Sequence, residues 1–209
     1  MTISTATARY HHGDLRAALL RAALDILAEH GVPGLTLREV ARRAGVSPMA
    51  PYRHFDSKDA LLAAVAEEGF RRLAQRLGDT PHADPMDDLV AQGMAYVRFA
   101  CDEPALYRLM FGPFLRRFED HPGLMEAALT AKAALTRAIA AATPAASEQV
   151  RADVALACWS LEHGLASLLV DGRLSTGKTM APEALAARLS RVLHEGVATI
   201  GGPPATEPR

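Results

Sequence analysis

Proline and glycine divide this 209-residue chain into segments whose apolar residues recur every three or four positions. That spacing places the apolar side chains on one face of an α-helix. The runs of β-branched residues that typify strands are absent, and Ala and Leu dominate a hydrophobic fraction of 49%. The pattern predicts an all-α fold of about nine helices with a sizeable core.

Capping signals define the first helices. The first helix is expected to stop at Gly31, where the chain turns through "GVPG". Thr36 and Glu39 form a capping box for a short second helix, which Gly45 ends. A later, longer helix begins after Asp56 or Ser57, whichever of the two is its cap.

The segment "SPMAPYRHF", Ser47 to Phe55, has two prolines where a third helix is expected. Ser47 would be its N-cap and Pro48 its first residue, where a missing N–H costs nothing. Pro51 would then lose one hydrogen bond in the first turn. We therefore expect a short helix with a tight or irregular first turn that begins between Pro48 and Pro51.

The polar stretch from Gly78 to Pro85 is rich in Pro and Asp and is the best candidate for a domain boundary. It divides the chain into domains at residues 9–77 and 86–200. Pro104, Pro144 and Pro182 lie where helices of the second domain would begin. The expected helices are residues 86–101, 104–111, 123–142, 145–170 and 182–199.

A short helix, a glycine and a further short helix form the spacing of a helix-turn-helix, whose second helix enters the DNA major groove. Small residues at Ala41 and Gly45 allow the two helices to approach each other, although ordinary helical hairpins share this spacing. The net charge of the chain is −1, yet five basic residues oppose two acidic ones between Thr36 and Lys58. Such a local basic surface suits nucleic acid.

The residues around this motif resemble a known family. The tracts "AGVS", "YRHF" and "SK" lie within a stretch from Thr36 to Leu62 that resembles the N-terminal domain of the TetR (tetracycline-repressor) family of bacterial transcriptional regulators. The resemblance extends from Leu15 to about Leu77. It implies a three-helix DNA-binding domain.

The expected DNA contacts follow from side-chain chemistry. Tyr52, His54, Lys58 and Thr36 can hold phosphates. Arg53 can make a bidentate contact to guanine, and a phosphate contact is an equally good alternative. The residues expected to read bases are Ser47, Pro48, Met49, Ala50 and Arg53, with Arg42 nearby.

A narrower resemblance covers the second domain. It rests on the tracts "ALACWSLEHGLASLLVDGRL", "EPALYRLMFG" and "YHHGDLR". They resemble a TetR branch named for a Trp-His-Gly signature, here Trp159, His163 and Gly164. The family implies a dimer in which the last two helices of each subunit form a four-helix interface, with a ligand pocket in each C-terminal domain.

The apolar residues of segment 145–170 support the dimer, because they form two stripes about 100° apart that must both be covered. The candidate effector pocket would suit a largely apolar ligand with a polar handle. A packed core containing Trp159 and His163 is the alternative. The candidate pocket residues are Tyr96, Phe99, Tyr107, Met110, Phe111, Phe114, Trp159 and His163.

The remaining motifs give no support for a metal site, a membrane-spanning segment or a catalytic site. Cys101 and Cys158 lie far apart, and the adjacent His11 and His12 point apart, so no metal or cofactor is expected. No apolar run reaches 18 residues and the N-terminus has no signal-peptide core, which predicts a cytoplasmic protein outside the membrane. No catalytic constellation and no phosphate-binding glycine loop is recognisable.

We therefore interpret the chain as a homodimeric transcriptional regulator, usually a repressor in this family, and not an enzyme. It would bind a pseudo-palindromic DNA operator and be released by a small-molecule effector. Two alternatives stay open: an effector-blind helical DNA-binding dimer, and a helical enzyme or carrier that uses the C-terminal pocket.

Overall fold

The computed structural model describes residues 12–78, 84–115, 118–175 and 180–200. Over these ranges the chain forms eight α-helices, two 3₁₀ helices and no strand, which confirms the all-α prediction. The nine expected helices are found, the third of them as a 3₁₀ helix. In chain order the elements are α1 His12–Gly34, α2 Leu37–Arg43, η1 Pro51–Arg53, α3 Lys58–Gly78, α4 Pro85–Asp102, α5 Pro104–Phe111, η2 Phe118–Asp120, α6 Pro122–Ala142, α7 Glu148–Val170 and α8 Pro182–Ile200.

Side-chain caps fix where several helices begin. The Oγ1 atom of Thr36 accepts a hydrogen bond from the Glu39 amide at 3.2 Å and opens α2 as predicted. Ser57, and not Asp56, caps α3, because its Oγ accepts from the Ala60 amide at 3.1 Å.

The predicted start of α7 was wrong by three residues. The Oγ of Ser147 accepts from the Val150 amide at 3.3 Å, so this serine, rather than Pro144, sets the start of the helix at Glu148.

Glycine produces the two turns of the N-terminal region. Gly31 has a φ of 64° and interrupts α1 within its assigned bounds, as its sequence predicted. After α2, the Gly45 amide donates to the Arg42 carbonyl at 3.2 Å and the Val46 amide to the Ala41 carbonyl at 3.0 Å. Gly45 has a φ of 68°, so the helix ends in a Schellman motif that aims the chain into the predicted DNA-facing turn.

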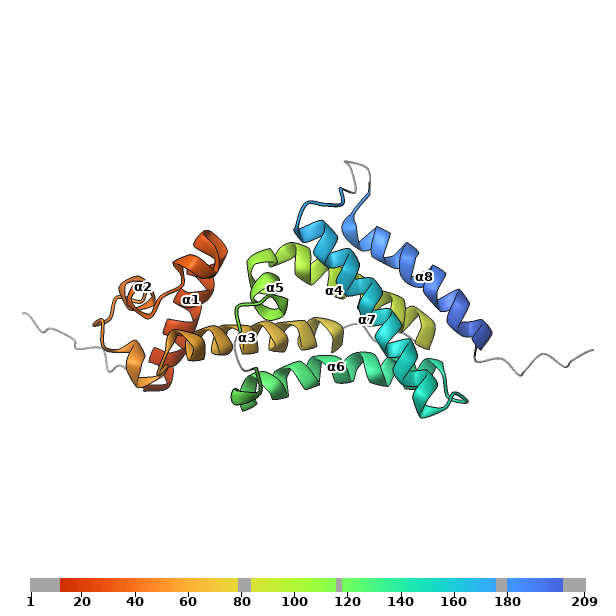
Figure 1. Ribbon diagram of the computed structural model, residues 1–209, viewed down its shortest axis with the longest axis horizontal. Coiled ribbons are helices and arrows are strands. Elements are labelled where there is room, and N and C mark those ends of the chain that lie inside the picture. The colour runs from red at the N-terminus through yellow and green to blue at the C-terminus, as the bar shows by residue number, and fades with distance from the viewer. Residues whose placement is uncertain (1–11, 79–83, 116–117, 176–179, 201–209) are drawn as a thin grey trace, which may run out of the picture.

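The helices form one elongated body (Figure 1). At one end, α1, α2 and η1 surround the start of α3. The long α3 then runs into the second half of the chain, where it packs against α6, while α7 and α8 pack against α4 at the other end. One continuous cluster of buried apolar residues extends from Leu19 in α1 to Ala186 in α8. Most of the expected boundary, residues 79–83, lies outside the described part of the chain.

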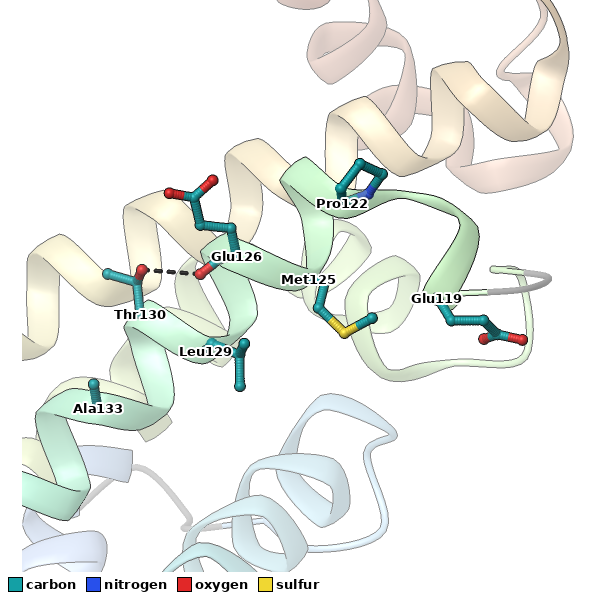
Figure 2. A pocket seen from close by; sticks show the side chains of 7 residues that line it. All are labelled: Glu119, Pro122, Met125, Glu126, Leu129, Thr130 and Ala133. Carbon is teal, nitrogen blue, oxygen red and sulfur yellow. Dashed lines mark hydrogen bonds between the residues drawn. The ribbon is translucent and has the colours of Figure 1, made fainter.

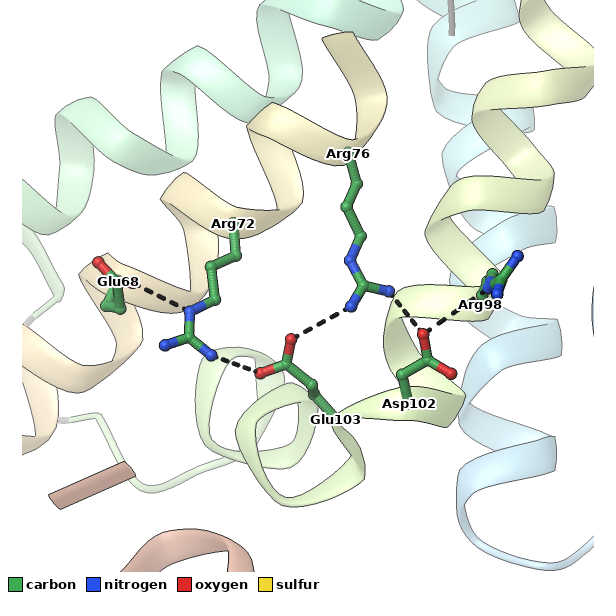
Figure 3. Close-up of polar contacts among 6 residues, drawn as sticks. All are labelled: Glu68, Arg72, Arg76, Arg98, Asp102 and Glu103. Atoms are coloured by element: carbon green, nitrogen blue, oxygen red, sulfur yellow. Dashed lines mark hydrogen bonds and ion pairs between the residues drawn. The ribbon is translucent and has the colours of Figure 1, made fainter. Parts of the chain in front are cut away.

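Ion pairs join α3 to the junction of α4 and α5 (Figure 3). The Arg72 guanidinium lies 2.9 Å from Glu68 and 3.0 Å from Glu103. Arg76 lies 2.7 Å from Asp102 and 3.4 Å from Glu103. These contacts fix the angle between the helix that leaves the N-terminal region and the first helices of the C-terminal region.

Replacing Gly45 tests the turn after α2. Gly45→Ala places a residue with a Cβ in the left-handed backbone conformation, which lowers the free energy of unfolding by about 1–2 kcal/mol. No other atom lies within 4 Å of the added carbon, so the cost comes from the backbone alone. We expect the melting temperature, measured by circular dichroism, to fall by about 2–8 °C. Gly78→Ala, which also meets no atom within 4 Å but has no positive φ, is the control and should change it little. Equal melting temperatures for the two variants would contradict the assigned strain.

Candidate functional site

The predicted DNA-facing residues form a compact turn. The Ala50 amide donates to the Ser47 carbonyl at 2.9 Å, the Arg53 amide to the Ala50 carbonyl at 3.2 Å, and the His54 amide to the Pro51 carbonyl at 2.9 Å. Each bond spans three residues, which is the 3₁₀ pattern. The expected tight, irregular turn is confirmed.

The expected role of the two prolines was wrong. Ala50, and not Ser47, is at the N-cap position, and Pro51, rather than Pro48, lies in the first turn of the helix. In an α-helix starting at Pro48, residue 51 would donate to the Ser47 carbonyl. Since Pro51 has no N–H, the Ala50 amide takes that carbonyl one residue earlier and the α-helix does not form there.

Burial anchors one side of this turn and exposes the other. Pro51 and Phe55 are buried, whereas Met49, Tyr52 and Arg53 beside them are exposed. Ala50 and His54 are half-buried. The side chains of Met49 and Tyr52 are 67% and 48% exposed, which is unusual for large apolar groups and typical of a contact surface. The other predicted contacts are also exposed: Thr36, Arg42, Ser47, Pro48, Arg53 and Lys58.

A groove of about 410 Å³ lies between α2 and the turn. It brings together three of the predicted residues, Thr36, Arg42 and Pro48. It also contains Arg38, which was not among the predicted contact residues. An arginine in the first turn of α2 could have been predicted as a DNA contact from the sequence. Lys58 lies at the start of α3, where its Nζ donates to the Val32 carbonyl at 3.3 Å.

Ion pairing separates the arginines of this surface into two groups. Arg42 makes two hydrogen bonds to Glu39, at 2.8 and 2.5 Å, and this contact lowers the pKa of the Glu39 carboxyl. Arg43 is paired with Glu29 in the same way, at 2.9 and 2.6 Å. Within the described ranges, Arg38 and Arg53 have no acidic partner.

A further cation lies beside the turn. The Arg16 guanidinium of α1 is 5.7 Å from the centre of the Phe55 ring, a cation–π contact that holds it next to the predicted DNA-facing residues. Sequence reasoning missed Arg16, because the contact joins residues that are far apart in the chain.

In the C-terminal region, two tyrosines converge on His163. The hydroxyls of Tyr96 and Tyr107 lie 2.9 and 3.0 Å from its Nδ1 atom. The Tyr107 hydroxyl also lies 3.1 Å from the Ser167 Oγ. Burial lowers the pKa of His163, so its ring is neutral near pH 7 and its Nδ1 atom can accept a hydrogen bond from a tyrosine hydroxyl.

Aromatic rings surround this hydrogen-bonded group. The centres of the Phe111 and His163 rings are 4.9 Å apart, those of Tyr107 and Phe111 are 5.1 Å apart, and those of Trp159 and His163 are 5.3 Å apart. Trp159 is 44% exposed, so one side of the cluster is open to solvent. The structure therefore brings five of the predicted effector residues together.

The other three predicted effector residues make different contacts. Phe99 is fully buried, and the Arg76 guanidinium lies 5.5 Å from the centre of its ring. Met110 is buried against Gly69 of α3. Phe114 follows α5 and is 40% exposed.

A second group of polar side chains lies buried between α4, α7 and α8, and sequence reasoning missed it. Glu162 is 6% exposed, and burial raises the pKa of its carboxyl to about 8. Three other buried atoms have no hydrogen-bond partner, namely Gln92 Oε1, Ser190 Oγ and His194 Nδ1. We call Gln92, Glu162, Ser190 and His194 the polar layer. Its only sequence signal was a polar residue on an otherwise apolar helix face.

The Glu162 carboxyl gives the fold a pH dependence. Its pKa is raised in the folded chain, so unfolding releases a proton and stability falls as the pH rises from about 4.5 to 8. We expect the wild-type melting temperature to drop by at least about 3 °C more between pH 5 and 8 than that of Glu162→Gln. The groups near this carboxyl are Ser190, which approaches the same point at Gly93, and Tyr96 and Cys158, whose pKa values the charge of Glu162 helps to raise.

The comparison with Glu162→Gln isolates this carboxyl. Burial also lowers the pKa values of His163 and His194. Both histidines are present in wild type and in Glu162→Gln, so their contributions to the pH dependence of the melting temperature cancel in the comparison. Glu126→Gln on the exposed face of α6 should retain the wild-type pH dependence. Parallel pH profiles for wild type and Glu162→Gln would show that Glu162 is not buried as a neutral acid.

A shallow groove of about 500 Å³ follows the side of α6 (Figure 2). Its floor is apolar, with Met125, Leu129 and Ala133, and Glu119 and Glu126 lie at its edge. None of the predicted effector residues lines it. Among the described residues, no group of three or more His, Cys, Asp and Glu side chains could hold a metal ion.

Comparison with known proteins identifies the family. The family model described as "Bacterial regulatory proteins, tetR family" matches residues 19–65. The one described as "Tetracyclin repressor-like, C-terminal domain" matches residues 89–193, half of the chain. The chain belongs to the TetR family.

Curated TetR-family relatives match mainly the N-terminal region. The tetracycline repressor class A from transposon 1721 of Escherichia coli is 57% identical over 49 residues, 23% of each chain. An HTH-type transcriptional regulator of Mycobacterium tuberculosis is 36% identical over 90 residues, 41% of this chain and 38% of the relative. The matches thus span between 23% and 38% of the length of these relatives.

Solved structures match over almost the whole chain. A protein of unknown function from Rhodococcus sp. RHA1 has a TM-score of 0.74 and 31% identity, covering 90% of this chain and 98% of its own. A TetR protein from Acinetobacter baumannii in complex with minocycline has a TM-score of 0.65 and 20% identity, covering 93% of this chain and 100% of its own. The second likeness concerns the fold alone.

Proposed function

We propose that this TetR-family chain is a homodimeric transcriptional repressor in the cytoplasm that binds a pseudo-palindromic DNA operator and leaves it when a small-molecule effector binds. The observation that carries the proposal is the turn from Ser47 to His54. Buried Pro51 and Phe55 hold it in place, while Met49, Tyr52 and Arg53 are exposed. A rigid turn with large exposed side chains beside unpaired cations suits the major groove.

The proposed contacts divide by chemistry. Tyr52, His54, Lys58 and Thr36 would bind phosphates and set the register. Ser47, Pro48, Met49, Ala50 and Arg53 would face the bases, Met49 and Ala50 meeting thymine methyl groups. Arg38 and Arg16 extend the cationic surface on either side. Arg42 contributes less than its sequence position suggests, because Glu39 already neutralises its charge.

Two arginines allow a matched test. Arg53→Ala should raise the dissociation constant for the operator by about 5- to 150-fold, the loss expected for one bidentate base contact. Arg42→Ala removes an arginine that is already paired with Glu39 and should raise it by less than about threefold. Fluorescence anisotropy with a labelled duplex from the upstream region of the gene measures both. A larger loss for Arg42→Ala than for Arg53→Ala would contradict the assignment.

The dimer would form through α7 and α8. By length and composition, α7 is the one helix of the described chain apolar enough to cross a membrane, yet only 28% of its most apolar stretch is buried. The large exposed apolar side chains of the two helices, up to residue 196, are Leu156, Trp159, Leu168 and Val192. A partner subunit covering this face would satisfy them, as the TetR family implies.

Substitution of two equally exposed leucines, one inside and one outside the proposed interface, tests this dimer. Leu156 on α7 and Leu129 on α6 are both 59% exposed. Leu156→Arg should give a folded monomer with operator affinity lowered by at least about tenfold, because a cation replaces an apolar contact in the seam. Leu129→Arg should remain a dimer. Light scattering measures the mass of each variant. If Leu156→Arg forms a dimer as stable as that of the wild type, this face of α7 and α8 is not the dimer interface.

The effector would bind beside the cluster of Tyr96, Tyr107, Phe111, Trp159 and His163, with Phe99, Met110 and Phe114 completing the predicted set. We also propose that the chain belongs to the branch with the Trp-His-Gly signature, with domains at residues 9–77 and 86–200. The effector-blind dimer and the helical enzyme or carrier are less favoured. The hydrogen-bonded tyrosines and the partly exposed Trp159 suit reversible ligand binding better than either alternative.

A further inference from the structure

We propose that the polar layer binds the protonated amine of an aromatic small molecule, which makes the effector an arylalkylamine-like cation. The inference rests on the proposed function, because it assigns the chemical class of the ligand that the C-terminal region would recognise. It concerns a site separate from the hydrogen bonds of His163.

The first argument is an uncompensated acid. Glu162 is buried between three helices, and no arginine or lysine of the described chain pairs with it. The cations of α8 lie elsewhere: Arg188 and Arg191 are exposed, and Arg191 lies 3.8 Å from Asp87. A buried carboxylate without a cation is costly, so the empty chain keeps it protonated. A ligand that brings its own cation would replace that proton.

The second argument is a set of buried, unpaired atoms on the neighbouring helices α4 and α8. Gln92 Oε1 can only accept hydrogen bonds, and Ser190 Oγ and His194 Nδ1 can also accept them. One N–H of the Gln92 amide already donates to Asp88 at 3.3 Å. An ammonium group has three N–H donors and no acceptor, and it therefore complements these atoms. A carboxylate would face the Glu162 carboxyl and find few donors.

The third argument is the close approach permitted at Gly93. A Cβ added there would lie 2.6 Å from Glu162 Oε1 and 2.8 Å from Ser190 Oγ. Only glycine lets both oxygens lie against α4 at one point. Two oxygens from different helices are thus held together without a hydrogen-bond donor from α4.

The fourth argument is continuity with the aromatic cluster. Tyr96 lies one turn along α4 from Gln92, and Trp159 and His163 lie beside Glu162 on α7. The charge of Glu162 contributes to the raised pKa of the Tyr96 hydroxyl, although burial is the larger cause. An aromatic ring stacked in the cluster would therefore place an amine on a short alkyl chain near the polar layer.

Three probes of similar size and different charge test the proposal on the full chain. These are 2-phenylethylamine, 2-phenylethanol and 3-phenylpropanoate at pH 7, measured by isothermal titration calorimetry. We expect saturable binding of the amine, at least about tenfold tighter than of the alcohol or the acid. Glu162→Gln should raise the dissociation constant of the amine by at least about tenfold and that of the alcohol by less than about threefold. Glu126→Gln should bind all three as wild type does.

Two results would overturn the proposal: no saturable amine binding to folded wild type, and equal amine affinity in Glu162→Gln. Either would show that the polar layer does not bind the amine. If Glu162→Gln fails to fold, Ser190→Ala provides the same comparison with one acceptor removed. Operator binding without any probe is measured separately. Its absence would refute the proposed repressor while leaving the amine result intact.

Discussion

The packing of α3 is the constraint on which the rest of this molecule depends. Its first turn, capped by Ser57, lies beside the proposed DNA-facing turn, and its last turns lie in the C-terminal region. Leu61 and Val65 are fully buried near one end, and Leu73 and Leu77 are buried near the other. Because one apolar core runs along this helix, a change in either region must displace side chains that both regions share.

The ion pairs of Arg72 and Arg76 lie where such a change would pass from one region to the other. They tie α3 to Glu103, at the junction from which α5 presents Tyr107 and Phe111 to His163. Ion pairs that are half exposed contribute little stability, but several in one network define a geometry. A ligand that separates α4 from α7 would therefore alter the angle of α3, and with it the distance between the two proposed recognition turns of the proposed dimer.

Local signals in the sequence predicted most of the fold, because caps, glycine turns and helix-starting prolines act within a few residues. The type of helix at Pro51 was harder to predict, because it depends on which backbone amide donates to the Ser47 carbonyl. The pairing of Arg42 with Glu39 is local and could have been predicted from their spacing. It lowers the contribution that we expect Arg42 to make to DNA binding. The polar layer could not be predicted: Gln92, Glu162 and Ser190 meet only after three helices have packed.

The salt dependence of operator affinity tests the central claim most directly, because a dimer that neutralises several phosphates releases their counterions. Anisotropy titrations of the full chain against its upstream duplex, at several salt concentrations, provide it. The proposed DNA-binding surface predicts a linear fall of log affinity with log salt, by roughly 10³-fold or more between about 50 and 200 mM. An affinity that stays constant over that range would contradict DNA recognition by this surface.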